Sequence, residues 1–494
     1  MPGINRLKNN KAPGEDLITG EMLKATVQGM GASKLHDLLN LIWEAEVCPE
    51  EWKHGTIIKL PKKGNLADCG NWRGITLLSV PGKIMAMILL DRIYEALDGR
   101  MREGQAGFRS GRSCADQIFV LRNIIEQSVE WQRQLVVNFI DFKKAFDSLH
   151  RPSMWKILRS YGLPSKIINM IKLLYEGSKS CVRVGGTNTD YFDITSGVKQ
   201  GDVLSPILFV VVVDWILRRT VGEEDGIEWM GTARLLELAY ADDIALLSED
   251  VDSMRRVTEK LALEASKVGL EINRTKTKVM AAQPREDISI VLEGEAIGRV
   301  ESFEYLGSFV CQDGDVRKEA GVRVGKAGAV FSRMKKVWNS GGISLKTKLR
   351  LFNATVMTVL LYGSETWKGL KEIENKLRVF ESNCLRKIMN IKWYEHVTEE
   401  EVRRRSGQQS VIQKWKTQRW RYYGHVLRMS EERLPKQVLS WTPEGRRRRG
   451  RPKDTWRRTI QRDVRSKELT DEDVQSAAHC REEWRRFIAD LWAT

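Results

Sequence analysis

Three aspartates stand at the ends of short apolar runs in the middle of this 494-residue chain. Asp141 follows the run Leu135–Ile140, and the pair Asp242-Asp243 separates two further apolar runs. Runs of this length, bounded by polar residues, are typical of buried strands, and a polar pair between two of them predicts a hairpin. The flanking strands would carry all three carboxylates to one edge of a common sheet.

Carboxylates gathered in this way are costly unless a cation compensates their charge. Hard oxygen ligands without Cys or His nearby favour Mg²⁺. Two such ions can clamp the attacking and leaving oxygens of a phosphoryl displacement. An Asp-Asp pair is also ordinary hairpin chemistry, so the pair alone does not decide between a metal site and a simple turn.

Further motifs accompany the aspartates in a fixed order. FIDFKKAFDS (139–148), SGVKQGDVLSP (196–206), YADD (240–243), GLEINRTKTK (269–278) and FEYLG (303–307) follow one another along the chain. This series resembles the reverse transcriptase motifs A to E of non-LTR (LINE-type) retrotransposons. Residues 11–14, 71–79 and 105–113 resemble the finger motifs of that family. Residues 361–367 and 448–456 resemble segments of animal endonuclease–reverse-transcriptase reading frames.

The resemblance implies an α+β fold of the right-hand polymerase type with a helical, basic C-terminal region. Fingers would span residues 1–130, a palm with motifs A to E 131–310 and a helical thumb 311–395. A basic, Arg- and Trp-rich nucleic-acid-binding region would span 396–494. The implied activity is that of an RNA-directed DNA polymerase in retrotransposition, which extends a DNA primer 3′-OH on an RNA template with deoxynucleoside triphosphates.

The same resemblance assigns the catalytic centre. Asp141, Asp242 and Asp243 would be the catalytic metal ligands, and Phe142 would offer its backbone carbonyl to a metal. The implied cofactor is a pair of Mg²⁺ ions, for which Mn²⁺ can substitute. Phe146 stands where the family has a steric gate that crowds a ribose 2′-OH, and a core Phe at helical spacing is the alternative.

Substrate contacts follow from the resemblance as well. The implied nucleotide-binding residues are Arg73, Lys83, Phe146, Gln200, Gly201, Lys276 and Lys278. Either Lys276 or Lys278 would be the general acid near the leaving pyrophosphate, and the sequence does not choose between them. Tyr305, Leu306 and Gly307 would form a primer grip, which is compatible with a buried hairpin strand.

Two residues depart from the family pattern. Glu15 replaces the proline that usually follows Lys-Ala-Pro-Gly, a change expected to be harmless in a loop. Asp202 follows Gln200-Gly201 where the family often has Cys, so an extra carboxylate is expected near the nucleotide.

The charge of the chain points to a polyanionic partner. The formal net charge is +16, and residues 401–470 hold 21 basic and 7 acidic side chains, so the rest is close to neutral. Arg446–Lys453 resembles an AT-hook, and a nuclear localisation signal is an equally good interpretation. The predicted nucleic-acid contacts are Arg109, Arg446, Arg447, Arg448, Arg449, Arg451 and Lys453.

Tryptophans alternate with arginines in the same region, which suits base stacking beside phosphate contacts. These five tryptophans are Trp415, Trp420, Trp441, Trp456 and Trp484. The alternative is an amphipathic helix pair with a solvated basic face. In the predicted thumb, seven apolar residues have core-like spacing: Phe331, Met334, Val337, Leu349, Phe352, Val356 and Leu360.

Other classes of protein are disfavoured. The seven cysteines are scattered and none approaches a histidine at zinc-ligand spacing, so neither a disulfide framework nor a zinc site is expected. No apolar signal core or membrane span is recognisable, which predicts a nuclear or cytoplasmic protein without a membrane partner. No endonuclease motif is recognisable either. We therefore expect a fragment that extends primers without nicking DNA, with the endonuclease encoded upstream in the full element.

Two rival functions remain compatible with the sequence. One is an inactive retroelement relic that only binds nucleic acid, although all three aspartates are present. The other is an RNA-dependent RNA polymerase, which Phe146 disfavours because such an enzyme needs room for the 2′-OH.

Overall fold

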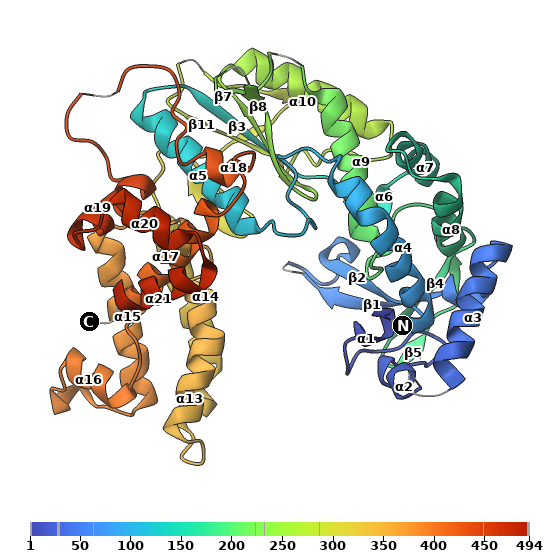
Figure 1. Ribbon diagram of the computed structural model, residues 1–494, viewed down its shortest axis with the longest axis horizontal. Coiled ribbons are helices and arrows are strands. Elements are labelled where there is room, and N and C mark those ends of the chain that lie inside the picture. The colour runs from blue at the N-terminus through green and yellow to red at the C-terminus, as the bar shows by residue number, and fades with distance from the viewer. Residues whose placement is uncertain are drawn as a thin grey trace.

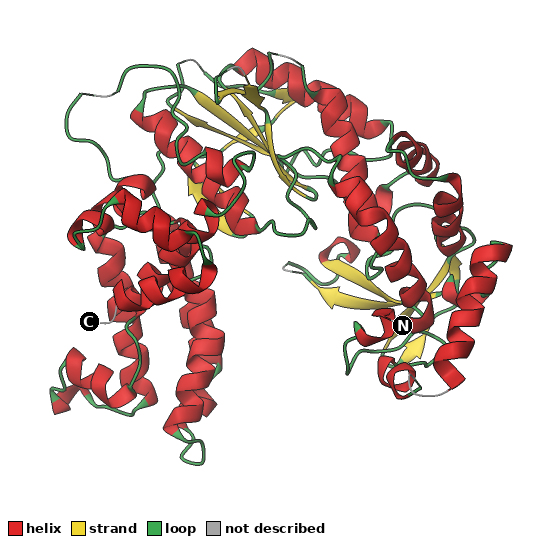
Figure 2. Ribbon diagram, viewed as in Figure 1, coloured by secondary structure: helices red, strands yellow, loops and turns green. Residues whose placement is uncertain are grey.

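The computed structural model describes residues 2–26, 30–62, 64–222, 224–231, 233–285, 287–447 and 449–491. In Figure 1 the chain forms an open arch, with the N-terminal part on the right, a sheet at the top and a helical part on the left. Figure 2 shows that most strands lie in the first two of these parts. The predicted α+β class is therefore confirmed.

A five-stranded sheet forms the centre of the N-terminal part. Its strands are β1 (Gly55–Pro61), β2 (Trp72–Leu77), β4 (Lys179–Val184), β5 (Thr187–Asn188) and β6 (Phe192–Asp193). The order is β2-β1-β4-β5, with β6 also beside β4. Strand β1 is antiparallel to β2 and parallel to β4. Strand β5 folds back onto β4 through a turn at Gly185-Gly186.

Helices surround this sheet. They are α1 (Pro2–Asn5), α2 (Gly20–Ala25), α3 (Met30–Ala45) and α4 (Val80–Asp98), with the 3-10 turns η1 (Glu50–Trp52) and η2 (Cys69–Asn71). Helix α4 begins after Ser79, whose hydroxyl accepts the amide of Gly82, and Pro81 lies in its first turn. Both features are common at helix starts. They place α4, which carries Lys83, directly after β2, which carries Arg73.

A second five-stranded sheet crosses the top of the arch. Its strands, in the order β14-β11-β3-β10-β9, are β14 (Gly298–Arg299), β11 (Lys278–Ala282), β3 (Leu135–Ile140), β10 (Asp243–Ser248) and β9 (Glu237–Tyr240). Strand β3 is buried along its whole length, as predicted. Its side chains alternate between two cores: Val136 and Ile140 enter one, and Leu135, Val137 and Phe139 the other.

Each face of this sheet is covered by helices. One core contains residues of α9 (Ser205–Thr220) and α10 (Val251–Ser266), and the other contains residues of α5 (Cys114–Glu130). Three further helices follow the central strands: α6 (Ala145–Ser148), α7 (Arg151–Ser160) and α8 (Ser165–Tyr175). Three separate strand pairs complete the described strands: β7 (Ile227–Trp229) with β8 (Ala233–Leu235), β12 (Val291–Leu292) with β13 (Glu295–Ala296), and β15 (Ser302–Tyr305) with β16 (Ser308–Cys311).

The predicted thumb is helical. Its elements are α11 (Arg317–Arg333), α12 (Lys335–Asn339), α13 (Leu345–Leu351), the π-helix η3 (Phe352–Met357), α14 (Thr358–Leu360), the 3-10 turn η4 (Ser364–Thr366) and α15 (Lys371–Ile388). The seven residues predicted to pack here all belong to one core, with Met334 and Val337 only partly buried.

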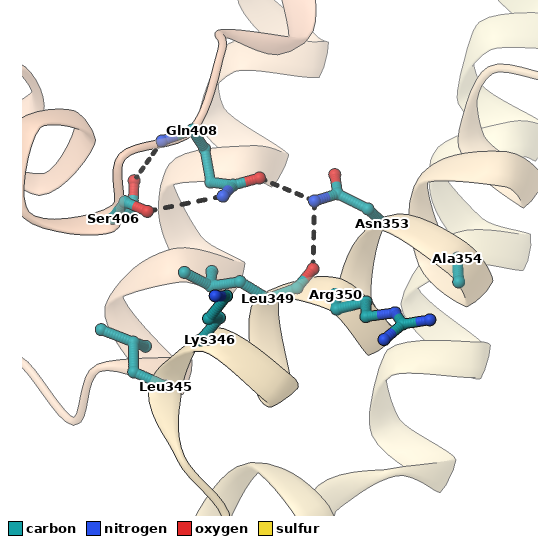
Figure 3. Close-up of a pocket in the computed structure, with 8 residues that line it drawn as sticks. All are labelled: Leu345, Lys346, Leu349, Arg350, Asn353, Ala354, Ser406 and Gln408. Carbon is teal, nitrogen blue, oxygen red and sulfur yellow. Dashed lines mark hydrogen bonds between the residues drawn. The ribbon is translucent and has the colours of Figure 1, made fainter.

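The C-terminal region is helical too and packs on the thumb. It comprises the 3-10 turn η5 (Trp393–Glu395), α16 (Glu399–Ser406), α17 (Val411–Leu427), α18 (Leu434–Gln437), α19 (Trp456–Ser466), α20 (Asp471–Ala478) and α21 (Arg481–Leu491). Figure 3 shows one contact with the thumb, where the Asn353 side chain donates to Leu349 O at 3.0 Å and to Gln408 Oε1 at 2.6 Å.

The predicted stacking role of the tryptophans is wrong. Trp415, Trp420, Trp441, Trp456 and Trp484 are each 5% exposed or less. Most of them share a core with α5 and the central sheet, and Trp415 belongs to the thumb core. These large apolar rings stabilise the fold by leaving water, so they do not offer stacking platforms to bases.

Helix α5 therefore packs both on the central sheet and on the C-terminal helices. The domain boundaries near residues 130, 310 and 395 stay predictions. In the described part of the chain, no helix is long and apolar enough to cross a membrane.

A substitution at Gly424 should test the packing of the C-terminal helices. A Cβ added to this glycine of α17 would overlap the indole of Trp484 on α21. Gly424→Ala should therefore destabilise the protein by about 1–3 kcal/mol, despite the better helix propensity of Ala. Thermal or urea unfolding measures the change.

Gly325→Ala is the matched control, because a Cβ at this glycine of α11 would meet no atom within 4 Å. It should stabilise by up to about 1 kcal/mol. Equal effects of the two substitutions would contradict the packing of α17 on α21.

Candidate active site

The three aspartates lie together at one end of the central sheet. Ile140 at the end of β3 pairs with Ile244 of β10, so Asp141 follows β3 beside the start of β10. Tyr240 pairs with Asp243, which leaves Ala241 and Asp242 as the turn of the β9–β10 hairpin. The predicted gathering of the carboxylates at one sheet edge is thus what the strand register produces.

The electrostatics of these acids reflect their proximity. Burial raises the pKa of Asp141 and of Asp242, and the charge of Asp141 raises that of Asp242 further. Burial and the charges of both other aspartates raise the pKa of Asp243 to about 6. The raised pKa values reflect burial of the carboxylates and, for Asp242 and Asp243, repulsion by their neighbours, and a bound cation would offset both effects.

The donor set suits a hard divalent cation. Asp141 Oδ2 is a buried oxygen that accepts no hydrogen bond from any residue in the described part of the chain. Within the same residues, no group of three or more His, Cys, Asp or Glu side chains could hold a metal ion by itself. The chemistry of the donors nevertheless fits, because Mg²⁺ is often held by one or two carboxylates together with water and substrate oxygens.

The structure distinguishes the two candidate lysines. Lys276 Nζ lies 3.7 Å from Asp141 Oδ2. Lys278 is the first residue of β11, where it pairs with Phe139 on one side and Gly298 on the other. Of the two, Lys276 is thus the one that reaches the aspartates.

Sequence reasoning missed two residues that hold Asp141 in place. The backbone amide of Asp141 donates to Thr277 Oγ1 at 3.2 Å, and its carbonyl accepts the amide of Asn273 at 2.7 Å. Phe142 is buried and forms a bridge with Ile272 of the same segment. The sequence does point to this segment, because Asn273 and Thr277 both lie in the motif at residues 269–278. That motif predicts a role only for its lysines.

The loop with Gln200 and Gly201 lies on strand β2. The amide of Thr76 donates to Gln200 O at 2.7 Å, and a Cβ at Gly201 would overlap Thr76 O. Gly201 has φ +127°, a conformation that favours glycine. The Gln200 side chain donates to Asp147 Oδ1 at 3.2 Å, which ties this loop to the motif that carries Asp141.

The two predicted triphosphate contacts flank that loop. Arg73 of β2 is exposed, and its charge lowers the pKa of Asp242, against the larger effect of burial. Lys83 of α4 is half-buried, and desolvation lowers its pKa although Asp202 and Asp16 act in the opposite direction. Asp202 itself is buried and accepts the Tyr175 hydroxyl at 3.1 Å.

Phe146 lies five residues after Asp141 and is half-buried. Its ring stacks on Phe209 of α9, with centroids 4.5 Å apart. It packs at the edge of the core between the sheet and α9. This position is compatible both with a core residue and with a gate whose ring is held rigidly by a neighbour.

The predicted primer grip is the turn of the β15–β16 hairpin. Tyr305 is buried and donates its hydroxyl to Leu238 O at 2.9 Å, next to the aspartate hairpin. Leu306 O accepts the Tyr362 hydroxyl at 2.9 Å, and Gly307 O accepts Arg323. The hairpin is therefore fixed between the central sheet and the thumb.

Comparison with known proteins gives the family. The profile of the family described as reverse transcriptase (RNA-dependent DNA polymerase) matches residues 60–310, which include all three aspartates. The chain belongs to the reverse transcriptase family. Members of this family generally depend on divalent metal ions. A second profile, for a domain of unknown function, matches residues 330–362 of the thumb.

Relatives of this chain come from non-LTR retrotransposons, as the sequence motifs predicted. It is 28% identical over 394 residues to the Retrovirus-related Pol polyprotein from type-2 retrotransposable element R2DM of Drosophila melanogaster, covering 76% of this chain and 36% of the relative. It is 24% identical over 410 residues to the RNA-directed DNA polymerase from mobile element jockey of Drosophila funebris, covering 79% and 43%. The chain thus spans less than half the length of these relatives.

Among solved structures, apo telomerase from Candida Tropicalis matches 83% of this chain and 73% of that chain. The TM-score is 0.43 and the sequence identity 14%.

Two sets of predicted nucleic-acid contacts have different outcomes. Arg446, Arg447, Arg449, Arg451 and Lys453 are exposed, although Arg447 forms an ion pair with Glu130 of α5. Arg448 lies outside the described residues. We define residues 442–455, which contain these cations, as the basic arm.

The prediction for Arg109 is wrong. Its side chain is 4% exposed and pairs with Asp98 at 2.6 Å. It also donates to the carbonyls of Arg102 at 2.7 Å and of Gln105 at 3.0 Å. A guanidinium enclosed by these partners cannot reach phosphates, so Arg109 holds the loop after α4.

Removing Arg109 should therefore affect folding rather than nucleic-acid binding. Arg109→Met removes the charged partner of the partly exposed Asp98 carboxylate and a donor shared by the carbonyls of Arg102, Gln105 and Asp98, which should cost roughly 3 kcal/mol of stability. The slope of log affinity for nucleic acid against log salt should stay unchanged, because no phosphate contact is lost. Unfolding curves and salt-dependent fluorescence anisotropy measure the two quantities.

Arg6→Met serves as the control, since Arg6 forms an exposed ion pair with Asp91. Its effect on stability should be at most about 1 kcal/mol. A salt slope reduced by about one in Arg109→Met would restore Arg109 as a phosphate contact.

Proposed function

We propose that this chain is an RNA-directed DNA polymerase that extends a DNA primer 3′-OH on an RNA template during retrotransposition. The observation that carries the proposal is the meeting of Asp141 with Asp242 and Asp243 at the end of the central sheet, within the residues that match the family. The substrates would be deoxynucleoside triphosphates, and the partners would be template RNA and primer or target DNA.

We propose Mg²⁺ as the cofactor, with Mn²⁺ as a substitute. Asp141, Asp242 and Asp243 would hold two ions, with the Phe142 carbonyl as a further ligand. Bound there, the ions would supply charge stabilisation for the attacking and leaving oxygens. Because the three carboxylates are only partly compensated by cationic side chains, ion binding would also lower the cost of keeping them charged.

The protein residues would position the substrates and the proton. Lys276, at 3.7 Å from Asp141, would donate a proton to the departing pyrophosphate. Arg73 and Lys83 would grip the triphosphate, for which the guanidinium fork is well shaped. Gln200 and Gly201 would support the nucleotide from the loop on β2.

Binding of the primer and of nucleic acid outside the catalytic centre would use two further elements. The turn Tyr305–Gly307 would hold the primer end, since it is fixed beside the aspartate hairpin. The exposed cations of the basic arm would contact phosphates of a duplex or of the RNA template. Affinity would then depend strongly on ionic strength.

Asp242→Asn tests the proposed reaction. The substitution keeps the shape of the side chain and removes its charge, so ion binding and charge stabilisation in the transition state are weakened. Primer extension on an RNA template should fall by more than about 100-fold. Gel analysis of a labelled primer with Mg²⁺ or Mn²⁺ measures the rate.

Asp252→Asn is a suitable control, because Asp252 lies exposed on α10 in a pair with Arg255. Its rate should match that of the unaltered chain. If the unaltered chain incorporates no deoxynucleotide with either ion, the inactive relic is the better description.

Phe146→Val tests the proposed steric gate. The smaller side chain would make room for a 2′-OH, so the preference for deoxynucleotides over ribonucleotides should fall at least about 10-fold. Ratios of kcat/KM for the two sugars measure this preference. Phe209→Leu removes the stacking partner without shortening Phe146 and should change the ratio far less. Unchanged sugar selectivity in Phe146→Val would make Phe146 a core residue only.

A further inference from the structure

The turn that carries the catalytic aspartates contains a residue in an unusual backbone conformation. Ala241, which precedes Asp242, has φ +58°, in the left-handed region that side-chain-bearing residues seldom adopt. Such a conformation persists only where surrounding contacts enforce it. The orientation of Asp242 therefore depends on what holds Ala241.

A loop from the predicted fingers packs directly on this turn. The amide of Ala239 donates to Gly104 O at 2.9 Å, and the amide of Ala106 donates to Ala239 O at 2.8 Å. Gly107 approaches so closely that a Cβ there would overlap the amide nitrogen of Ala241. The loop thus continues the sheet beyond β9 and contacts the backbone of the turn.

The side chain of Gln105 supplies the hold on Ala241. It is completely buried, and its Oε1 accepts the amide of Ala241 at 3.0 Å and that of Gly107 at 2.8 Å. This one oxygen thus accepts hydrogen bonds from two buried backbone amides. Without it both amides would lack an acceptor, which would lower the stability of the fold. It also fixes the distance between the loop and the turn.

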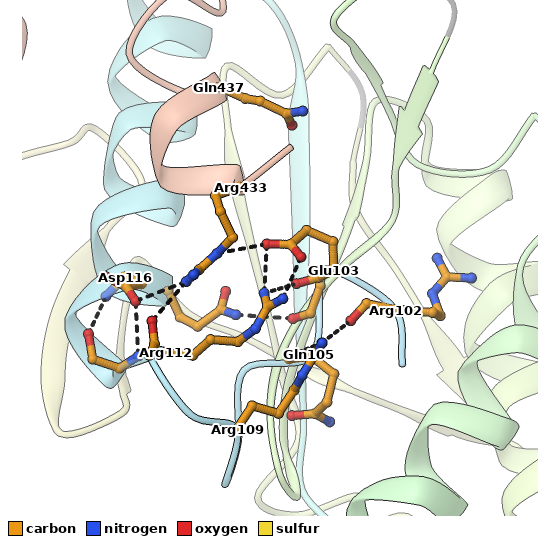
Figure 4. A network of polar contacts seen from close by, with 12 residues as sticks. Arg102, Glu103, Gln105, Arg109, Arg112, Asp116, Arg433 and Gln437 are labelled. Carbon is orange, nitrogen blue, oxygen red and sulfur yellow. Dashed lines mark hydrogen bonds and ion pairs between the residues drawn. The ribbon is translucent and has the colours of Figure 1, made fainter. Parts of the chain in front are cut away.

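The loop is itself held from the C-terminal region, as Figure 4 shows. Arg433, just before α18, lies 3.1 Å from Glu103 and 3.6 Å from Asp116, and it donates to Gly111 O at 3.2 Å. Arg112 makes two contacts of 2.6 Å with Glu103. The loop therefore contacts the segment that leads into α18 through Arg433 and the aspartate hairpin through Gln105.

We propose that Gln105 is a positioning residue for catalysis, which holds the Ala241 amide and thereby sets the orientation of Asp242. Arg433 supports the same turn indirectly, because it holds the loop that carries Gln105. The C-terminal helices would then contribute to catalysis, because they hold the loop that supports Asp242. The proposal rests on the proposed polymerase function and deepens it.

Gln105→Met tests the proposal, because Met has a similar volume but no strong acceptor. The kcat of primer extension should fall roughly 10- to 100-fold, as expected for a small displacement of a catalytic group. The affinity for primer–template, measured by fluorescence anisotropy, should change by less than about twofold, because Gln105 does not contact nucleic acid in this scheme. Hydrogen exchange at the Ala241 amide should become at least tenfold faster.

Asn123→Leu is the matched control. Asn123 is also completely buried, and its side chain donates to Phe119 O within α5, away from the turn. It should lower the melting temperature without changing kcat or exchange at Ala241. Exchange at Ala241 that is no faster in Gln105→Met than in this control would overturn the proposal.

Arg433→Met provides a second variant should Gln105→Met fold poorly. It should accelerate exchange at Ala241 by a smaller factor, because it loosens the loop and leaves Gln105 in place. Unaltered exchange in this variant would overturn the link to the C-terminal region. If the unaltered chain makes no DNA, the proposed function fails, while the exchange measurements still decide whether Gln105 holds the turn.

Discussion

The register between β3 and β10 is the constraint on which the rest of the molecule depends. Pairing Ile140 with Ile244 places Asp141 beside Asp242 and Asp243, and a shift by one residue would turn the side chains of the strand to the opposite face. The cost of gathering three partly buried carboxylates appears in their raised pKa values. The surrounding core must therefore hold a register that electrostatic repulsion opposes.

Core residues support strand β3 on both of its faces. Val136 and Ile140 of β3 pack toward α9 and α10, whereas Val137 and Phe139 pack toward α5 and the C-terminal helices. Since β3 is buried on both faces, a slipped register would disturb two cores at once. Segments more than 300 residues apart in sequence contribute to the same support, because the Tyr422 hydroxyl of α17 donates to Asp116 of α5 and the Trp456 amide donates to Glu126.

Much of this arrangement could be predicted from local patterns. The apolar run Leu135–Ile140 is a fully buried strand, the predicted hairpin is present although Asp243 already belongs to β10, and the thumb residues with helical spacing form a core. These features depend on short-range periodicity, which a sequence displays directly. Motif order then indicated the family, because it constrains several segments at once.

The two wrong predictions, for Arg109 and for the tryptophans, concern side chains whose partners cannot be recognised from the sequence alone. Arg109 looked like a phosphate contact because a sequence does not reveal that Asp98 and two carbonyls enclose it. Trp420 looked like a stacking platform, yet its ring packs on Trp484 and its indole N–H donates to Asp463. Trp occurs both at interfaces and in interiors, and Arg can be buried only where partners compensate its charge, so the role of each is decided by long-range packing.

The basic arm is bounded at both ends by buried tryptophans. Trp441 stacks on Trp229, and Trp456 lies edge-on to Phe119 of α5. The arm is therefore a loop with two fixed ends rather than a free tail. Phosphates bound by the exposed cations of the arm, as we propose, would therefore be held close to α5 and the central sheet, because both ends of the arm are anchored in that core.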